Sequence, residues 1–418
     1  MKITKIDLLY SDPVEDNWRP SFCRIYTDRG IYGDGEVALS YGGAKEAAFI
    51  EMKELAPMLI GMNPLEHEVI WQKLYRNSFF GKNAGPVIFG AISAFDIALW
   101  DIKGKYYQAP LWELLGGKQR DHLKAYASQL QMGWGESRKP AASAQDYANN
   151  TKIALEKGFK TVKINFLTFD ERGKQVPWQK QTAFLSNNYL NLAEERIKAV
   201  RDTLGKDGEL ILENHALTDK LSAVQYGKMA SKYNILYFEE PVKPDPDLLS
   251  YVHQETGLNI ASGERMYSRW DFKRAFDQNS IQVAQPDICT AGGVTEVKKI
   301  CDMADTSELG VQIHVAGSNL ATSVSLNLEA AIPNFVIHEY NINTEMSKML
   351  SLTKYDYEPE SGVFTVPDRP GIGNEISDYA FKHSRVVTVK WNRNFCTWWW
   401  FGSNFILKNV YLKFKSRI

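Results

Sequence analysis

Residues 209–219 read "ELILENHALTD", and this stretch changes character within a few positions. Residues 210–212 are three consecutive apolar residues, which is typical of a buried strand in a parallel sheet. Glu213 and His215 follow two positions apart, so in a strand they share one face. A strand that ends in a carboxylate and an imidazole is either a polar end that reaches water or one wall of a functional site.

The same pattern recurs along the chain from about residue 125. Eight short apolar segments occur in series: "AYASQLQ", "KTVKINF", "ELILENH", "ILYFEEP", "NIASGER", "SIQVAQPD", "GVQIHVAG" and "FVIHEY". Stretches with helical periodicity separate them, such as "YANNTKIALEKG" and "NLAEERIKAVRDTLG". Eight βα units in series predict an α/β fold with a modified (β/α)8 TIM-type barrel over residues 125–354.

An ionisable residue stands at the end of each of the last six segments. These residues are Glu213, Glu239, Glu264, Asp287, His314 and Glu339. Their successive spacings are 26, 25, 23, 27 and 25 residues, or one per βα unit. The carboxyl ends of barrel strands converge on one mouth, where TIM-type enzymes keep their chemistry. The spacing therefore predicts a single site, and it argues against six unrelated solvated strand ends.

The first third of the chain has a different organisation. Residues 2–39 read as three antiparallel strands with the turn sequence "TDRGIYGDGE", and residues 44–117 have helical periodicity. The segment 86–107 is apolar nearly all round, so we expect a buried helix. We predict an α+β capping domain over 1–124, joined by part of 355–385.

The last residues, 386–418, form a predicted basic and aromatic tail of unknown role. After Asp378 there are eight Lys or Arg and no acidic residue, and four of the 11 tryptophans lie there. Such a segment could bind a membrane or nucleic acid. We favour an extension without a catalytic role.

Composition excludes several classes of function for the chain as a whole. The 418 residues are 44% hydrophobic and 24% charged with a net charge of -1, which gives no electrostatic case for binding nucleic acid or an anionic membrane. The first residues show no signal peptide, and no run of 18 apolar residues occurs. The four cysteines are far apart, as expected for reduced thiols. We expect a cytoplasmic protein, a homo-oligomer, with a small-molecule partner.

Three glutamates on adjacent strand ends would place three carboxylates in one site. They are Glu213, one glutamate of "FEEP" (238–241) and Glu264. Without a cation they would repel and raise one another's pKa. All-oxygen ligation without cysteine favours Mg²⁺ over Zn²⁺. Neutralisation by Lys163 or Arg265 is the alternative.

The other polar strand ends suggest acid–base chemistry. Asp287 beside His314 would orient the imidazole and raise its basicity, as a general base requires. His215, on another wall of the mouth, could act as a general acid. Lys163 and Asn165 share a face, where the lysine can hold an anionic oxygen and the amide cannot abstract a proton. This set suits removal of a proton α to a carboxylate, followed by loss of a β-hydroxyl.

The motifs resemble the mandelate racemase branch of the enolase superfamily, and within it most closely the D-galactonate dehydratases. The similar segments are "AISAFDIALWDIKGK" (91–105), "LWELLGG" (111–117), "FEEPV" (238–242), "GERMYSRWDFKRAF" (263–276) and "QPDICTAGGVTE" (285–296). The resemblance covers roughly residues 1–375. It implies a capping domain over a modified barrel, with substrate-selecting cap loops at about 11–21 and 38–43.

The resemblance also implies roles for individual residues. It selects Glu239 as the "FEEP" ligand of Mg²⁺, together with Glu213 and Glu264, although the first ligand is usually Asp in the family. It implies a His314–Asp287 dyad, with His215 as the acid and Glu339, Lys163, Asn165 and Arg265 around the substrate. The implied activity is dehydration of an acid sugar to a 2-keto-3-deoxy acid.

Three alternatives stay open. A racemase or epimerase usually needs bases on both faces of the substrate, and Asn165 argues against a second one. A cycloisomerase would need only His314. A non-catalytic acid-sugar-binding protein on the same scaffold is the third alternative, and the presence of both histidines argues against it.

Overall fold

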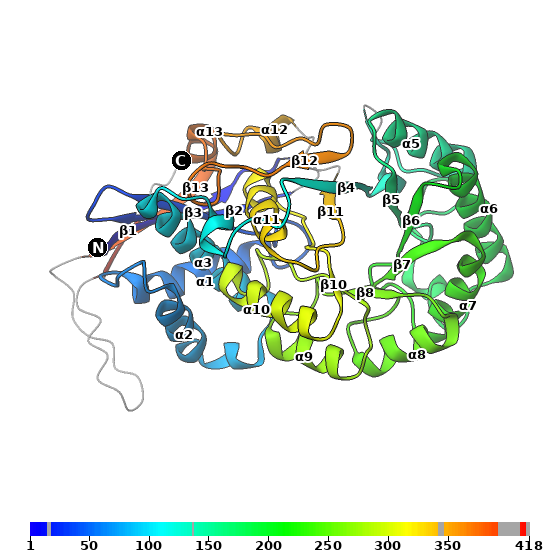
Figure 1. Cartoon of the computed structure of the whole chain (residues 1–418), viewed down its shortest axis with the longest axis horizontal. Helices are drawn as coiled ribbons and strands as arrows, with labels where there is room; N and C mark the ends of the chain where they lie inside the picture. Colours follow the sequence, from blue (N-terminus) through cyan, green and yellow to red (C-terminus); the bar gives the residue numbers. More distant parts are fainter. Residues whose placement is uncertain (15–17, 136–137, 342–346, 392–409, 415–418) are drawn as a thin grey trace.

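The computed structural model describes residues 1–14, 18–135, 138–341, 347–391 and 410–414. The chain builds two sheets with separate sets of helices (Figure 1). The N-terminal elements, in blue, lie at one end of the molecule, and the helices that follow the barrel strands curve around the other end (Figure 1). In the described ranges, no helix has both the length and the apolarity needed to cross a membrane.

The capping domain contains an antiparallel sheet in the order β14-β13-β1-β2-β3. Its strands are β1 (Ile3–Ser11), β2 (Ser21–Thr27), β3 (Tyr32–Val37), β13 (Ser384–Trp391) and β14 (Val410–Phe414). Its helices are α1 (Lys45–Leu55), α2 (His67–Asn77), α3 (Pro86–Tyr107) and α4 (Leu111–Leu114). The three N-terminal strands and α3, which is buried over most of its length from Phe89 to Gly104, confirm the sequence prediction for this part.

The C-terminal part of the capping sheet corrects one predicted boundary. Strand β13 pairs antiparallel with β1, so residues 386–391 of the predicted tail belong to this sheet. Val387 and Val389 are buried and pack into the core of the cap, which explains why the strand is held there. The stretches 392–409 and 415–418 of the predicted tail lie outside the described residues.

The second sheet is the predicted barrel. It orders its strands β10-β9-β8-β7-β6-β5-β4-β11, and each neighbouring pair is parallel. The strands are β4 (His122–Ser128), β5 (Thr161–Ile164), β6 (Glu209–Glu213), β7 (Ile235–Glu239), β8 (Ile260–Ser262), β9 (Val283–Ala284), β10 (Gly310–Val311) and β11 (His338–Asn341). Val311 of β10 also bonds to the segment just before β11: its N–H donates to Asn334 O, and Val336 N–H donates to Val311 O, both at 2.8 Å. All eight apolar segments therefore contribute a strand to one curved parallel sheet.

Helices follow the barrel strands on the outside of the ring (Figure 1). They are α5 (Ala144–Glu156), α6 (Asn187–Leu204), α7 (Lys220–Ala230), α8 (Pro246–Thr256), α9 (Arg269–Asp277), α10 (Gly293–Thr306) and α11 (Asn319–Ala331). The remaining elements are α12 (Ser347–Leu350), β12 (Val363–Thr365), which pairs with β4, and α13 (Asp378–Lys382). Several helices begin at capping side chains, such as Ser143 for α5 and Asp219 for α7.

Helix α3 connects the cap to the barrel. On one side it packs against β3, where Gly33 and Gly35 allow the strand to approach the helix backbone closely. On the other side, the Asp96 carboxylate accepts hydrogen bonds from the backbone N–H and hydroxyl of Thr295 in the first turn of α10. Glu36 of β3 makes a similar pair of hydrogen bonds to Ser318, at the start of α11. These buried polar contacts fix the cap beside the barrel mouth.

Candidate active site

Three carboxylates meet where neighbouring barrel strands end. Glu213 is the last residue of β6 and pairs in register with Glu239, the last residue of β7. Glu264 lies two residues after β8. One oxygen atom from each of the three carboxylates lies within 4.8 Å of the other two. The structure thus brings the three predicted metal ligands together.

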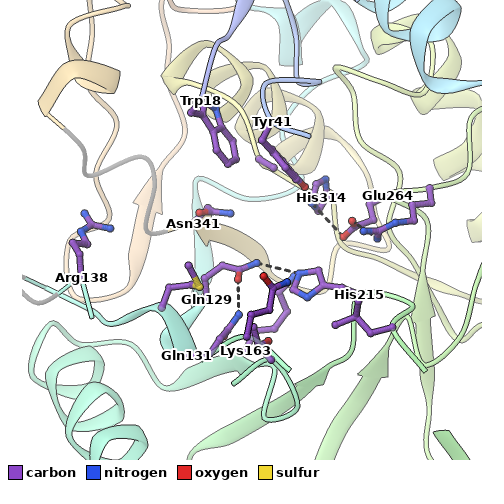
Figure 2. A pocket seen from close by; sticks show the side chains of 16 residues that line it. Trp18, Tyr41, Gln129, Gln131, Arg138, Lys163, His215, Glu264, His314 and Asn341 are labelled. Carbon is purple, nitrogen blue, oxygen red and sulfur yellow. Dashed lines mark hydrogen bonds and ion pairs between the residues drawn. The ribbon is translucent and has the colours of Figure 1, made fainter. Parts of the chain in front are cut away.

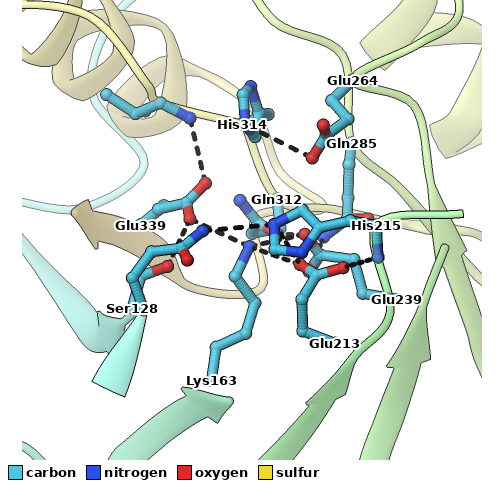
Figure 3. A network of polar contacts seen from close by, with 12 residues as sticks. Ser128, Lys163, Glu213, His215, Glu239, Glu264, Gln285, Gln312, His314 and Glu339 are labelled. Carbon is cyan, nitrogen blue, oxygen red and sulfur yellow. Dashed lines mark hydrogen bonds and ion pairs between the residues drawn. The ribbon is translucent and has the colours of Figure 1, made fainter. Parts of the chain in front are cut away.

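Lys163 of β5 forms ion pairs with two members of this cluster (Figure 3). Its Nζ lies 2.5 Å from Glu239 Oε1, 2.9 Å from Glu339 Oε1 and 3.3 Å from Glu213 Oε2. Burial opposes the lysine charge, but these carboxylates outweigh it and raise the lysine pKa well above its ordinary value. Burial and the neighbouring Glu213 raise the pKa of Glu239. The sequence alternative, a lysine that neutralises the carboxylates, is therefore present in this structure.

The donor set of the cluster still fits a divalent cation. All three residues offer carboxylate oxygens, which Mg²⁺ prefers. Glu213 Oε2 is buried and accepts no hydrogen bond, and Lys163 Nζ lies 3.3 Å from it. A metal ion would satisfy this oxygen by direct ligation. Glu213, Glu239 and Glu264 could therefore hold a metal ion.

Arg265 and Glu240 form a second charged group beside the cluster. The Arg265 guanidinium donates to the carboxylates of both Glu240 and Glu264. Glu240 has a φ of 42°, a backbone conformation that turns its side chain away from that of Glu239 and toward the arginine. Of the two "FEEP" glutamates, Glu239 thus joins the carboxylate cluster and Glu240 pairs with Arg265.

His314 is oriented by two carboxylates. Its Nδ1 lies 2.8 Å from Asp287 Oδ2, and its Nε2 lies 3.4 Å from Glu264 Oε2. Burial opposes the imidazolium, but Glu264 and the hydrogen bond to Asp287 outweigh it and raise the pKa of His314 to about 10. The same ion pair, together with Arg265, overcomes the effect of burial on Glu264 and lowers its pKa to about 2. The predicted His314–Asp287 dyad is present with the geometry that orients a base.

His215 follows β6 and lies beside the carboxylate cluster (Figure 3). Its backbone N–H donates to Glu213 Oε1 at 2.7 Å, and its Nε2 lies 3.8 Å from Glu213 Oε2. Burial, together with the cations of Lys163 and Arg265, lowers the pKa of His215 to about 4 despite the opposing effect of Glu264. The imidazole is therefore neutral at pH 7 in the ligand-free protein. A neighbouring anionic substrate would favour its protonated form.

Two predicted substrate contacts lie beneath the site. Glu339 accepts hydrogen bonds from the Ser128 hydroxyl and the Val315 N–H, in addition to its contact with Lys163. Asn165 is fully buried, and its amide nitrogen lies 3.1 Å from Nδ1 of His215. Glu339 thus holds Lys163, and Asn165 holds His215.

A pocket of about 460 Å³ opens above these residues (Figure 2). His215, Glu264, Arg265 and His314 line one part of it. Trp18 and Tyr41 come from the two predicted cap loops, and their rings stack with centroids 4.5 Å apart. Further lining residues are Gln129, Gln131, Met132, Arg138, Lys163, Thr168, Gln175, Leu217, Ala316 and Asn341. The cap and the barrel together enclose a space suited to a small polar molecule.

The sequence analysis missed Gln129 and Gln131 as site residues. They follow β4 in the segment "AYASQLQ" and stand two positions apart, as Glu213 and His215 do at the end of β6. Their two-residue spacing indicates that the two side chains share a face. The prediction of the site rested on ionisable residues at strand ends, and glutamine is not ionisable. Gln129 adopts a φ of 68°, which is unusual for a residue other than glycine.

Comparison with known proteins agrees with this geometry. Residues 18–116 match the family model described as mandelate racemase / muconate lactonizing enzyme, N-terminal domain, and residues 146–380 match enolase C-terminal domain-like. The chain belongs to the mandelate racemase and muconate lactonizing enzyme family of the enolase superfamily. The resemblance seen in its motifs is thereby confirmed at the family level.

Several solved structures are similar to this chain over most of its length. An enolase superfamily member from Salmonella Typhimurium is 41% identical, with a TM-score of 0.91, covering 93% of this chain and 100% of that chain. A candidate dehydratase from Zymomonas mobilis ZM4 has the same identity and TM-score, covering 93% of this chain and 99% of that chain. The 3,6-anhydro-D-galactonate cycloisomerase of Zobellia galactanivorans is 30% identical with a TM-score of 0.77, covering 92% of this chain and 99% of that chain. Enolase superfamily sites typically use Mg²⁺.

Proposed function

We propose that this enzyme is a Mg²⁺-dependent dehydratase of an acid sugar, with D-galactonate as the first candidate substrate. The observation that carries the proposal is the placement of two histidines around one carboxylate cluster. Nε2 of His314 lies 3.4 Å from Glu264 Oε2, and Nε2 of His215 lies 3.8 Å from Glu213 Oε2. Both histidines line the same pocket. A substrate held at the cluster would therefore lie within reach of both imidazoles.

The first proposed step is removal of the proton α to the substrate carboxylate. A neutral His314 takes this proton on Nε2, while Asp287 holds Nδ1 and stabilises the imidazolium that forms. The neutral form requires the pKa of His314 to fall, as it would if a cation at the carboxylate cluster offset the charge of Glu264, which raises that pKa. The electrons of the C–H bond move toward the carboxylate group. Mg²⁺ held by Glu213, Glu239 and Glu264 would supply positive charge that offsets this negative charge. Lys163, held by Glu339, adds a second positive charge on the barrel side.

The second proposed step is loss of the β-hydroxyl group. The C–O bond breaks, its electrons stay with the oxygen, and a proton from His215 converts the departing group to water. The remaining enol takes up a proton at C3 and becomes the 2-keto-3-deoxy acid. Because burial keeps His215 neutral without ligand, the acid role depends on the negative charge that the substrate brings.

A cycloisomerase is the second candidate function, since one similar structure is named 3,6-anhydro-D-galactonate cycloisomerase. Such a reaction would use His314 in the same way. A racemase or epimerase is less favoured because Asn165, on the face where a second base would stand, bonds to His215 and cannot take a proton. We further expect that an acid sugar is the partner, with no nucleic acid or membrane, and that the chain forms a homo-oligomer.

A screen of mono- and diacid sugars tests the proposed function. The purified enzyme is incubated with each compound in Mg²⁺ and, separately, in EDTA, and the 2-keto-3-deoxy product is measured. The proposal expects product from at least one acid sugar, with D-galactonate tested first, and loss of activity in EDTA. Product from an anhydro sugar acid alone would favour the cycloisomerase. Binding of acid sugars without product or α-proton exchange would favour the non-catalytic alternative.

A further inference from the structure

Three side-chain amides connect the barrel backbone to His215. We call Gln131, Gln129 and Asn165 the amide relay. Gln131 Nε2 donates to Gln129 Oε1 at 2.6 Å, and Gln129 Nε2 lies 3.2 Å from His215 Nε2 (Figure 2). On the other side of the ring, Asn165 Nδ2 lies 3.1 Å from His215 Nδ1. Both nitrogens of one imidazole therefore face amide groups.

Backbone N–H groups determine which way two of these amides point. Leu167 N–H donates to Asn165 Oδ1 at 3.0 Å, so the NH₂ group of Asn165 must face His215. Asn165 N–H donates to Gln131 Oε1 at 3.3 Å, so the NH₂ group of Gln131 must face Gln129. A backbone N–H can only donate, and the two amide orientations are therefore not interchangeable.

The orientation of Gln129 follows from that of Gln131. Its oxygen accepts from the Gln131 NH₂ group, which leaves its own NH₂ group toward His215. A reversed Gln129 would set two NH₂ groups against each other at hydrogen-bond distance. The relay thus presents an N–H donor to each ring nitrogen of His215.

A neutral imidazole has one donor and one acceptor nitrogen, so it can accept only one of these two bonds. Asn165 is fully buried and tied to the backbone, whereas Gln129 is half-buried at the pocket wall. Nδ1 is therefore the acceptor, and Nε2 carries the proton. Without ligand, the N–H groups of His215 and Gln129 meet as two donors.

We propose that His215 and Gln129 together form a two-donor site for one substrate oxygen, with Asn165 and Gln131 as positioning residues. An oxygen placed between them accepts from Nε2–H of His215 and from the NH₂ group of Gln129, which resolves the donor–donor contact. If the proposed function holds, this oxygen is the departing hydroxyl. Two fixed donors would then stabilise the negative charge that develops on it as the C–O bond breaks.

The tautomer of His215 can be tested without any substrate. Protein labelled with ¹⁵N-histidine gives distinct ring nitrogen shifts for protonated and unprotonated positions, and His215→Asn assigns the signals of this residue. The structure predicts a protonated Nε2 and an unprotonated Nδ1 in the parent protein at neutral pH. Asn165→Asp should move the proton to Nδ1, because a carboxylate there can only accept. A parent protein with the proton on Nδ1 overturns the proposal.

The role of Gln129 can be tested by reversing the orientation of its side-chain amide. Gln131→Glu replaces the donor that faces Gln129 with a carboxylate oxygen, so Gln129 turns its NH₂ group toward Glu and its carbonyl toward His215. Elimination, measured with D-galactonate or the acid sugar found in the screen, should fall about 10²–10³-fold, as for loss of one fixed donor. Gln129→Met should give a similar loss. In both variants α-proton exchange through His314 should change by less than about threefold, since that step precedes the departure of the hydroxyl.

Gln145→Glu is the matched control, because Gln145 is exposed on α5, does not line the pocket, and the substitution adds the same charge. An equal fall in elimination with Gln145→Glu would show that charge alone is responsible and would overturn the proposed donor role of Gln129. Elimination at the parent rate in Gln131→Glu and Gln129→Met would overturn it as well. If no acid sugar reacts, the proposed function fails while the tautomer measurement still decides the role of Asn165.

Discussion

At the scale of single residues, Lys163 compensates the negative charge of the buried glutamates. Its ammonium group is buried among three glutamates, and two of these are candidate metal ligands. Buried carboxylates without a partner are strongly destabilising, so the site needs a cation, either the lysine or a metal ion. The lysine and the metal ion therefore neutralise the same carboxylates. Loss of the lysine should make the stability of the protein depend more strongly on the metal ion.

Lys163→Met should make folding depend on Mg²⁺. In EDTA the variant leaves buried carboxylates uncompensated, and we expect a loss of about 3–5 kcal/mol. Millimolar Mg²⁺ should raise the thermal unfolding midpoint of the variant more than that of the parent, because the ion stabilises the folded state by mass action. Differential scanning calorimetry in both buffers measures this.

Lys105→Met is the matched control, since Lys105 also forms an ion pair, with Asp101 at 2.7 Å in the cap. Mg²⁺ should not restore its stability. Equal restoration of both variants, or of neither, would contradict a metal site at the three glutamates.

At the scale of elements, the contact of β3 with α3 holds the cap together. A Cβ atom on Gly35 would lie 1.8 Å from the carbonyl oxygen of Ala94, and one on Gly33 would lie 2.1 Å from that of Ala98. Both contacts are to helix backbone, which cannot turn aside as a side chain can. Glycine at these two positions of β3 is therefore a requirement of the packing.

Gly35→Ala should destabilise the protein by about 3 kcal/mol, because the added methyl group forces strand and helix apart. Gly43→Ala is the control, since no atom lies within 4 Å of a Cβ at that position. Chemical denaturation of both variants measures the difference. Similar stability of the two variants would show that β3 can shift without cost.

The sequence predicted elements well where their pattern is local. All eight barrel segments, the three N-terminal strands and the buried α3 follow from the period of their apolar residues. The pairing of β13 with β1 joins residues almost 380 positions apart, and no local pattern encodes it. In the site, ionisable strand ends were found from their spacing. Gln129 and Gln131 were not, because their role depends on the direction of hydrogen bonds that only coordinates reveal.

At the scale of the whole molecule, buried polar contacts join the cap to the barrel. Glu36 of β3 accepts hydrogen bonds from the N–H and hydroxyl of Ser318, four residues after His314. Burial raises the pKa of Glu36 to about 7, although the hydrogen bonds from Ser318 oppose this effect. The carboxyl that connects the two parts therefore changes its charge near neutral pH.

This shifted pKa predicts how stability depends on pH. Between pH 4.5 and about 7 the folded protein keeps a proton on Glu36 that the unfolded chain loses, so stability should fall as pH rises through this window. The effect should reach at most about 3 kcal/mol and should be complete above pH 7. Glu36→Gln, which cannot titrate, should remove this part of the pH dependence. Parallel unfolding midpoints of parent and variant from pH 4.5 to 8 would contradict the shifted pKa.

The central claim is that His314 removes the α-proton and His215 protonates the departing hydroxyl group. Exchange of the α-proton in deuterated water tests this claim most directly. Parent, His314→Asn and His215→Asn proteins are incubated with Mg²⁺ and the acid sugar from the screen, and exchange and elimination are followed together by NMR. His314→Asn should lose both, and His215→Asn should keep exchange while elimination falls about 10²–10⁴-fold. Exchange at the parent rate in His314→Asn, or elimination at the parent rate in His215→Asn, would contradict the account.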